Sequence, residues 1–285
     1  MTKPKLILFG DAKRPNAREA QSHFLSFVQD KAEVLFNCFE GNCPVELLRK
    51  ADFAVVFGGD GTILSAAREF CETRIPVIGV NVGKLGYLAE FNVEEVIELF
   101  DQIISGKTDI EKRIVLNCSL IRSGQIILSS IALNDVVITA GAPFRMIEVE
   151  MRVRGQKLTG CVGDGIILST PTGSTAYNLS AGGPILSANL EAFVLTPICA
   201  HSLSFRPIVI SSSSEVEIRP IRLNDDSMLL LDGQIQHPLT REDRIQVVRH
   251  NERFLIVNNP MRTQWDTLAE KLKWGETPRY RINTE

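Results

Sequence analysis

The sequence lacks several features that would assign it to a class at once. It has no apolar run of the ~18 residues that a membrane-spanning helix needs, and the apolar run at residues 6–9 is too short for a signal-peptide core. Its 31 lysines and arginines do not outnumber its 34 acidic residues, and a net charge of −3 argues against a nucleic-acid coat or a polybasic membrane binder. It has no internal repeats. We therefore expect a soluble cytoplasmic protein that binds neither nucleic acid nor membrane.

The six cysteines are scattered, and Cys38 and Cys43 are the only close pair. No second pair and no histidine cluster accompanies them, so neither structural zinc nor a disulfide framework is favoured. Small reduced thiols, partly buried, are the simpler interpretation. A chain of 285 residues buries a large core and needs neither metal nor disulfide to hold it together.

Two common nucleotide-binding motifs are also missing. The chain has no G-x-x-x-x-G-K-[ST] segment, which excludes a P-loop enzyme. The segment GGDGTIL lacks the glycine spacing of a dinucleotide-binding Rossmann turn. Any nucleotide is therefore bound in another way.

Two kinds of periodicity divide the chain. Up to residue 112, short apolar strands alternate with helical stretches, which is typical of βαβ units and a parallel sheet. The run from 113 to 257 is rich in β patterns with few helical stretches and predicts a sandwich or layered sheet. Residues 263–273 are again helical. We expect an α/β domain of residues 1–112, joined by a C-terminal helix within 258–285, and an all-β domain of residues 113–257.

The strongest motif is Gly58-Gly59-Asp60-Gly61-Thr62, between a predicted buried strand and a helix predicted from Ile63. Glycines there let backbone N–H groups approach phosphate oxygens, and a helix N-terminus adds favourable partial charge. A carboxylate beside phosphates is repulsive unless it holds a cation or takes a proton. Asp60 therefore indicates Mg²⁺ binding or deprotonation of an attacking hydroxyl. The alternative is a tight turn in which Asp60 or Thr62 caps the helix.

Other segments carry polar groups that need partners. Residues 170–184 predict a turn into a short helix that ends at Gly182-Gly183, either a cradle for adenosine or a plain polar loop. Asn134-Asp135 interrupts an apolar run and is either a strand bulge or a ligand contact, and Asp164 poses the same choice. Arg145 is either a phosphate partner or a surface residue.

Together these segments resemble the NAD kinase family in its bacterial form. GGDGT, Asn134-Asp135, Asp164-Gly165 and TPTGSTAYNLSAGGP at 170–184 occur in the family's order and spacing, and the similarity covers nearly the whole chain. GGDGT alone is shared with diacylglycerol and sphingosine kinases and, loosely, with phosphofructokinases. The segment 170–184 is far more specific.

The resemblance implies an N-terminal α/β domain plus an all-β C-terminal domain, the NAD kinase and diacylglycerol kinase-like fold, with a cleft between them. It implies transfer of the ATP γ-phosphoryl group to the 2′-hydroxyl of the adenosine ribose of NAD, which gives NADP. Mg²⁺ or another divalent cation is expected to come with ATP, with no tightly bound metal. The family also implies a homo-oligomer, tetramer or dimer, whose sites borrow residues across subunits.

The residue roles follow from the same resemblance. Asp60 is the expected proton acceptor, and Asn134 and Asp135 are expected to bind the dinucleotide. Tyr177 is the expected aromatic wall of the adenosine site. The other expected contacts are Gly58, Gly59, Gly61 and Thr62 for phosphate, and Arg145, Asp164, Thr175, Ala176, Asn178, Leu179, Ser180 and Gln234 for the substrates. His201 lies near the family's pocket or is a core histidine.

One departure from the family bears on the substrate. Some bacterial members carry an arginine two residues before the aspartate that matches Asp164, and it is associated with strict preference for NAD over NADH. Here that residue is Val162, so we expect relaxed discrimination against NADH. The alternatives to an NAD kinase are a lipid kinase of the diacylglycerol or sphingosine type and a non-catalytic dinucleotide-binding regulator. The sequence does not decide whether polyphosphate replaces ATP or whether NADPH inhibits.

Overall fold

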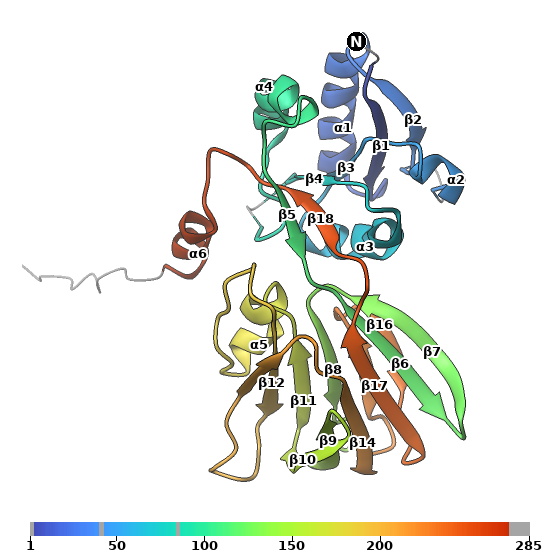
Figure 1. The fold of residues 1–285 in the computed structure, drawn as a ribbon, viewed down its shortest axis with the longest axis vertical. Helices are drawn as coiled ribbons and strands as arrows, with labels where there is room; N and C mark the ends of the chain where they lie inside the picture. Colours follow the sequence, from blue (N-terminus) through green and yellow to red (C-terminus); the bar gives the residue numbers. More distant parts are fainter. Residues whose placement is uncertain (1–2, 40–42, 84–85, 274–285) are drawn as a thin grey trace, which may run out of the picture. The chain divides into compact units, whose positions relative to one another are not determined.

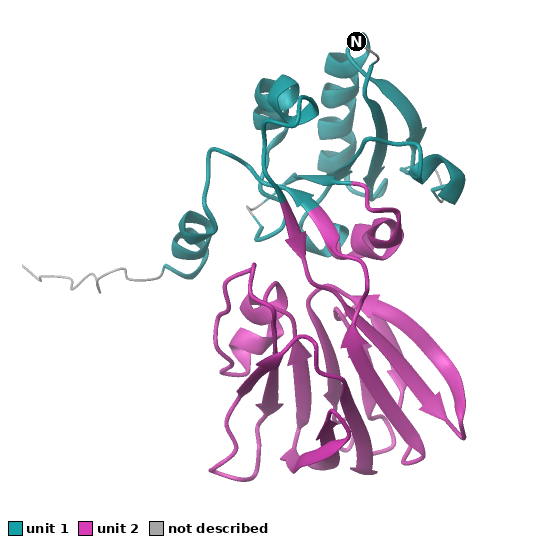
Figure 2. Ribbon diagram, in the orientation of Figure 1, with its two compact units in different colours: residues 1–63, 76–110, 256–285 teal, residues 64–75, 111–255 magenta. Residues whose placement is uncertain are grey.

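The computed structural model describes residues 3–39, 43–83 and 86–273, and it divides the chain into two compact units (Figures 1 and 2). Unit 1 comprises residues 1–63, 76–110 and 256–285, and unit 2 comprises residues 64–75 and 111–255. Helix α3 (Asp60–Phe70) therefore begins in unit 1 and ends in unit 2. None of the helices within the described ranges is long and apolar enough to cross a bilayer.

The first sheet is a six-stranded sheet of order β2-β1-β3-β4-β18-β5. Its strands are β1 (Lys5–Gly10), β2 (Glu33–Asn37), β3 (Phe53–Phe57), β4 (Val77–Val80), β5 (Ile110–Arg113) and β18 (Phe254–Val257). Besides α3, the described helices before residue 110 and after residue 255 are α1 (Pro15–Val28), α2 (Val45–Leu48), α4 (Val93–Ile104) and α6 (Gln264–Leu272), and a 3₁₀ turn η1 (Cys71–Thr73) follows α3. The pairings of β1 with β2 and β3, of β3 with β4, and of β4 with β18 are parallel, which confirms the α/β prediction.

Helices α1 and α4 bury their apolar faces in one core with the first sheet. Phe24 of α1, Phe57 of β3 and Phe100 of α4 are fully buried. The ring centroid of Phe24 lies 5.7 Å from that of Phe57 and 6.1 Å from that of Phe100, distances typical of favourable aromatic pairs. This packing fixes β3, whose carboxyl end leads into the glycine-rich turn.

Unit 2 contains two six-stranded antiparallel sheets, of order β10-β9-β14-β17-β6-β7 and β13-β12-β11-β8-β15-β16. The strands are β6 (Leu116–Arg122), β7 (Gln125–Ala132), β8 (Asp135–Thr139), β9 (Ile147–Val153), β10 (Gln156–Gly163), β11 (Gly165–Ser169), β12 (Ala192–Ile198), β13 (Ile208–Ser211), β14 (Val216–Arg222), β15 (Met228–Leu231), β16 (Ile235–Pro238) and β17 (Asp243–Arg249). One hydrophobic core takes residues from both sheets, so the prediction of a layered all-β region is confirmed.

The central strands of the second of these sheets are buried on both faces. Val136 and Ile138 of β8 belong to the core between the sheets, whereas Val137 belongs to a smaller cluster on the other face with Ile167 and Ala181. This double burial explains why the runs around β8 and β11 are continuously apolar rather than alternating.

One prediction about the cysteines is wrong. Cys38 and Cys43 form a disulfide, with 5.3 Å between their Cα atoms. Their spacing alone does not reveal it, because a bridge depends on how the chain turns after β2. Cys71, Cys118 and Cys161 are buried free thiols, and burial raises the pKa of Cys118 to about 12, so that thiol stays protonated.

Candidate functional site

Asp60 is the first residue of α3, directly after the Gly58-Gly59 turn that follows β3. The helix begins three residues before the predicted start at Ile63, because the N–H groups of Thr62 and Ile63 already donate to the carbonyl of Gly59, at 2.9 and 3.2 Å. From the first position of the helix, the carboxylate of Asp60 meets a second segment of unit 1, residues 87–89.

Three consecutive backbone N–H groups hold the Asp60 carboxylate. Tyr87 donates to Oδ2 at 2.9 Å, and Leu88 and Ala89 donate to Oδ1 at 3.0 and 3.4 Å. A Cβ on Gly86 would lie only 2.0 Å from Oδ1, so this close approach requires glycine. A carboxylate offers about four acceptor positions, and the three donors leave one on Oδ2 for a hydroxyl group.

Tyr87 adds a polar group beside this carboxylate. Its phenolic oxygen is buried and has no hydrogen-bond partner among the described residues. Burial, and then the negative charge of Asp60, raise the pKa of Tyr87. The phenol is therefore neutral near pH 7 and able to donate a hydrogen bond.

A cavity of about 400 Å³ opens beside the glycine turn. Its lining consists of Lys13, Arg14, Pro15, Asn16, Gly59, Asn81, Val82 and Gly83. Lys13 and Arg14 directly precede the first residue of α1, where the helix adds positive partial charge. Arg14 also forms an exposed ion pair with Asp11 at 3.6 Å. Our sequence analysis missed this wall, and the available signal was Lys13-Arg14-Pro15 between a strand and a helix.

In unit 2 the structure brings the Asn134-Asp135 segment against the start of residues 170–184. The N–H of Thr170 donates to the carbonyl of Asn134 at 2.9 Å, and its hydroxyl donates to the carbonyl of Leu133 at 2.6 Å. A Cβ on Gly173 would lie 2.1 Å from the Asn134 carbonyl oxygen, so the two segments pack backbone to backbone. The polar stretch is therefore tied to β8 rather than forming a detached loop.

The rest of that stretch is the predicted turn and short helix, a 3₁₀ turn η2 (Gly173–Thr175) and helix α5 (Tyr177–Ser180). Asn178 is fully buried: its amide donates to the carbonyls of Ser174 and Pro184 and accepts from Thr196. Tyr177 is 43% exposed. Thr175, Ala176 and Leu179 are half-buried, and Ser180 is exposed. Asn178 therefore shapes the segment, whereas Tyr177 is presented at its surface.

Asp232 is the buried partner of the Asn134-Asp135 turn, and our sequence analysis missed it. Its carboxylate accepts the backbone N–H groups of Leu133, Asn134 and Asp135 at 3.0, 2.7 and 3.2 Å. Its own N–H donates to the carbonyl of Asp135 at 3.0 Å. The one signal for it is an Asp-Gly pair at the end of the apolar run that became β15.

Asp135 and Gln234 lie at this same end of the sheet. Asp135 is 4% exposed, and burial, with a further contribution from the charge of Asp232, raises its pKa to about 7. The side-chain carbonyl of Gln234 accepts from the hydroxyl of Ser65 at 2.9 Å and from the guanidinium of Arg68.

Arg145 and Asp164 lie at the opposite end of the same sheet. Strands β8 and β11 pair Asp135 with Ser169 and Thr139 with Gly165, so Asp164 is about 15 Å from Asp135, one strand length away. Arg145 is exposed in the segment that follows β8. The structure therefore separates the predicted contacts of unit 2 into two groups. The first lies at the end of the sheet that carries Asp135, and the second, with Arg145 and Asp164, lies at the opposite end.

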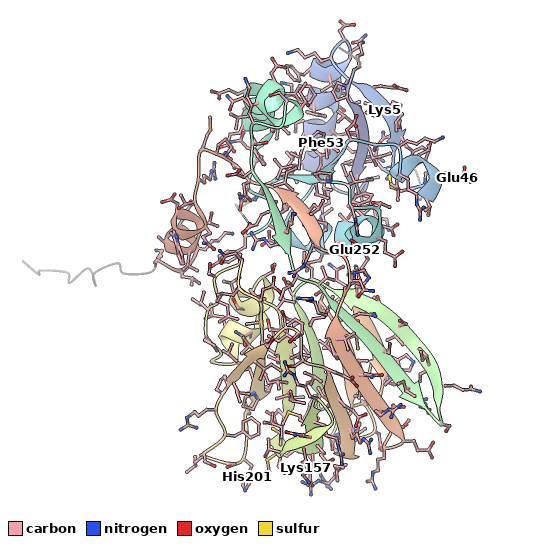
Figure 3. All side chains as sticks on the ribbon, viewed as in Figure 1. Lys5, Glu46, Phe53, Lys157, His201 and Glu252 are labelled. Atoms are coloured by element: carbon pink, nitrogen blue, oxygen red, sulfur yellow. A yellow bond between two sulfur atoms is a disulfide. The ribbon has the colours of Figure 1, made fainter. Side chains whose placement is uncertain are left out.

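His201 and Cys199 belong to this second group. His201 is exposed, which contradicts a core histidine, and Figure 3 shows it at the end of unit 2 away from α5. A hydrogen bond to Asp164, together with the charge of that carboxylate, raises the pKa of the exposed Cys199 thiol. Among the residues that the structure describes, no three His, Cys, Asp or Glu side chains are grouped so that they could hold a metal ion.

The raised pKa of Asp135 predicts a pH-dependent stability. The folded state holds this proton more tightly than the unfolded state, whose aspartate pKa is about 3.9, so the contribution of Asp135 to stability is lost as pH rises from about 4 to about 7. In the wild type, this lowers the free energy of unfolding by an amount on the order of a few kcal/mol, and we expect D135N to lack that decrease. Urea unfolding at pH 5 and pH 8 measures it, and parallel pH dependences for wild type and D135N would contradict it.

Comparison with known proteins identifies the family to which the chain belongs. The model of the ATP-NAD kinase N-terminal domain matches residues 18–108, and that of the ATP-NAD kinase C-terminal domain matches residues 133–259. An NAD kinase of Geobacter metallireducens is 44% identical over 280 residues, which are 95% of this chain and 99% of the relative. An NAD kinase of Desulforamulus reducens is 40% identical over 270 residues, 93% of each chain.

Solved structures agree with this match. The yeast NADH kinase complexed with NADH has a TM-score of 0.86 at 27% identity, over 97% of this chain and 89% of that one. An NAD kinase from Archaeoglobus fulgidus in complex with ATP has a TM-score of 0.76 at 26% identity, over 94% and 98%. With both domain models matched in order and relatives of 40% and 44% identity over more than 90% of the chain, this chain belongs to the NAD kinase family.

Proposed function

We propose that this chain transfers the γ-phosphoryl group of ATP to the 2′-hydroxyl of the adenosine ribose of NAD, with Asp60 as the proton acceptor. The observation that carries the proposal is the Asp60 carboxylate, fixed by three backbone N–H groups with one acceptor position left. Membership of the NAD kinase family supplies the reaction and both substrates. The proposed location is the cytoplasm, where ATP and NAD are both present.

The chemical step is an in-line displacement. The 2′-oxygen of the ribose forms a bond to the γ-phosphorus while the bond from that phosphorus to the β–γ bridging oxygen breaks, and ADP leaves. The hydroxyl proton passes to Asp60. Because such transition states are loose, the proton leaves late and orientation of the hydroxyl contributes most of the rate gain. Rigid backbone donors suit that task, since they hold the carboxylate without a flexible side chain.

The cavity beside Gly59 supports a place for the phosphate chain of ATP. Lys13 and Arg14 supply positive charge at its edge, and Asn16 and Asn81 supply neutral polar groups. Gly59 has no heavy atom within 4 Å of the position where a Cβ would stand, so a phosphate can approach its backbone closely. Mg²⁺ would arrive with ATP, held by phosphate oxygens and water, and neutralise the developing charge.

Asn134, Asp135 and Tyr177 form the proposed dinucleotide site at one end of unit 2. Tyr177 has the exposed ring that an adenine can stack on, and the Asp135 carboxyl can bond to ribose hydroxyls. Arg145 and Asp164, one strand length away, do not reach this site within one chain. We therefore propose that they complete the site of a neighbouring subunit in a homo-oligomer.

Replacing the proposed proton acceptor tests the mechanism. We expect D60N to lower kcat by about 10²–10⁴-fold while NAD still binds, because the amide can orient the hydroxyl but cannot take its proton. Steady-state formation of NADP and calorimetric titration with NAD measure the two effects. Turnover close to that of the wild type would exclude Asp60 from this role.

The companion variant G86A keeps the charge and displaces the carboxylate. Its Cβ would stand 2.0 Å from Asp60 Oδ1, so kcat should fall although the aspartate remains. The matched control is G160A, whose nearest neighbour would be the Val149 carbonyl at 3.7 Å, an ordinary contact. Equal activity of the two variants would show that the position of the carboxylate is unimportant.

Val162 predicts that NADH is also a substrate. This residue is half-buried in β10, and its carbonyl accepts the N–H of His201 at 2.8 Å, which places it in the second group of unit 2. We expect measurable phosphorylation of NADH by the wild type and a lower NADH-to-NAD rate ratio in V162R. Initial rates with the two dinucleotides at equal concentration give the comparison. A negligible NADH rate in the wild type would refute relaxed discrimination.

A further inference from the structure

We infer that Asp232, held by Arg68, is a positioning residue for the dinucleotide-binding turn at Asn134 and Asp135. The inference deepens the proposed function and rests on it for the identity of the ligand. Arg68 and Asp232 both lie in unit 2, Arg68 in the part of α3 that follows residue 63 and Asp232 between β15 and β16.

Asp232 determines the backbone of the turn. Its carboxylate receives the N–H groups of three successive residues, 133 to 135, and the N–H of Asp232 returns a bond to the carbonyl of Asp135. A carboxylate that accepts several N–H groups fixes their directions together. The side chains of Asn134 and Asp135, which start from that backbone, are therefore aimed by Asp232.

Asp232 is buried and lies beside a cation. Its side chain has no exposed surface, and Nη1 of Arg68 lies 3.6 Å from Oδ2. Arg68 is itself held, because its Nη2 donates to the hydroxyl of Ser65 at 3.2 Å and to the side-chain carbonyl of Gln234. Burial raises the pKa of Asp232, whereas the three backbone N–H groups and then the charge of Arg68 act in the opposite direction. Loss of a cation beside a buried carboxylate is unfavourable, so Arg68 contributes to holding Asp232 in its ionised form.

Asp232 also acts on Asp135 through its charge. Asp232 is the charged neighbour that acts on the buried carboxyl of Asp135, and Arg68 faces Asp232 from α3. Removing the negative charge of Asp232 should therefore lower the pKa of Asp135. This shift reports the contact between the two carboxyls, separately from any change in the stability of the fold.

The test compares D232N with a matched control, D243N. Asp243 is also fully buried at its side chain, pairs with Arg122 at 2.7 Å and accepts the N–H of Thr240, but it lies on β17 in the other sheet. We expect D232N to raise KM for NAD about tenfold or more, the factor for one lost charge-assisted hydrogen bond, with KM for ATP unchanged. The acidic limb of kcat/KM for NAD should move to lower pH. D243N should change stability without either effect.

Two further variants keep the test decisive if D232N does not fold. R68M should reproduce the rise in KM for NAD, and R68K, which keeps the charge, should recover part of it. Equal rises in KM for NAD and ATP, or an unshifted pH limb in both D232N and R68M, would overturn the inference. Thermal unfolding of D232N at pH 5 and pH 8 tests this inference independently of the proposed function. If the wild type makes no NADP, a pH dependence of stability displaced from that of the wild type still supports the action of Asp232 on Asp135, and an undisplaced one still overturns it.

Discussion

A carboxylate set against three consecutive backbone N–H groups is the contact on which the candidate site of each unit depends. In unit 1, Asp60 accepts from residues 87 to 89, and in unit 2, Asp232 accepts from residues 133 to 135. In each case a charged group at a strand end joins a segment distant in sequence. The two contacts differ in their surroundings: Asp60 has one acceptor position left over, whereas Asp232 is buried and faces a cation.

Periodicity was enough to predict most of the fold. The alternation of strands and helices before residue 112 is visible because parallel strands are short apolar runs and α1 and α4 carry an apolar stripe. It cannot show which sheet a strand joins. Strand β18 looks like its neighbours in the β-rich run, yet it pairs in parallel with β4, because pairing depends on where the chain arrives in space.

The motifs predicted the candidate site in part. Asp60 and Asn134-Asp135 stand out, since a polar residue inside an apolar run needs a partner. Their partners do not stand out: Leu88 offers Asp60 only a backbone N–H group, and Asp232, the partner of Asn134-Asp135, lies almost 100 residues further along the chain. Arg68 looks like an ordinary helix-surface residue. The wide separation of Arg145 and Asp164 from Asp135 was also not readable, since it follows from the antiparallel register of β8 and β11. Sequence motifs show which residues are unusual, and the register decides which of them meet.

The backbone donors around Asp60 and Asp232 have a consequence for how these sites tolerate mutation. Every amino acid except proline carries an N–H group, so holding the two carboxylates places little demand on the side chains of the six donor residues. Asn134 and Asp135 differ from the other four because their side chains are also proposed to bind the dinucleotide. The two acceptors have no such freedom, and neither has Gly86, whose missing Cβ makes room for the carboxylate. Drift at residues 87 to 89 and 133 to 135 can therefore leave the geometry of both carboxylates unchanged, whereas a single proline there would remove a bond outright.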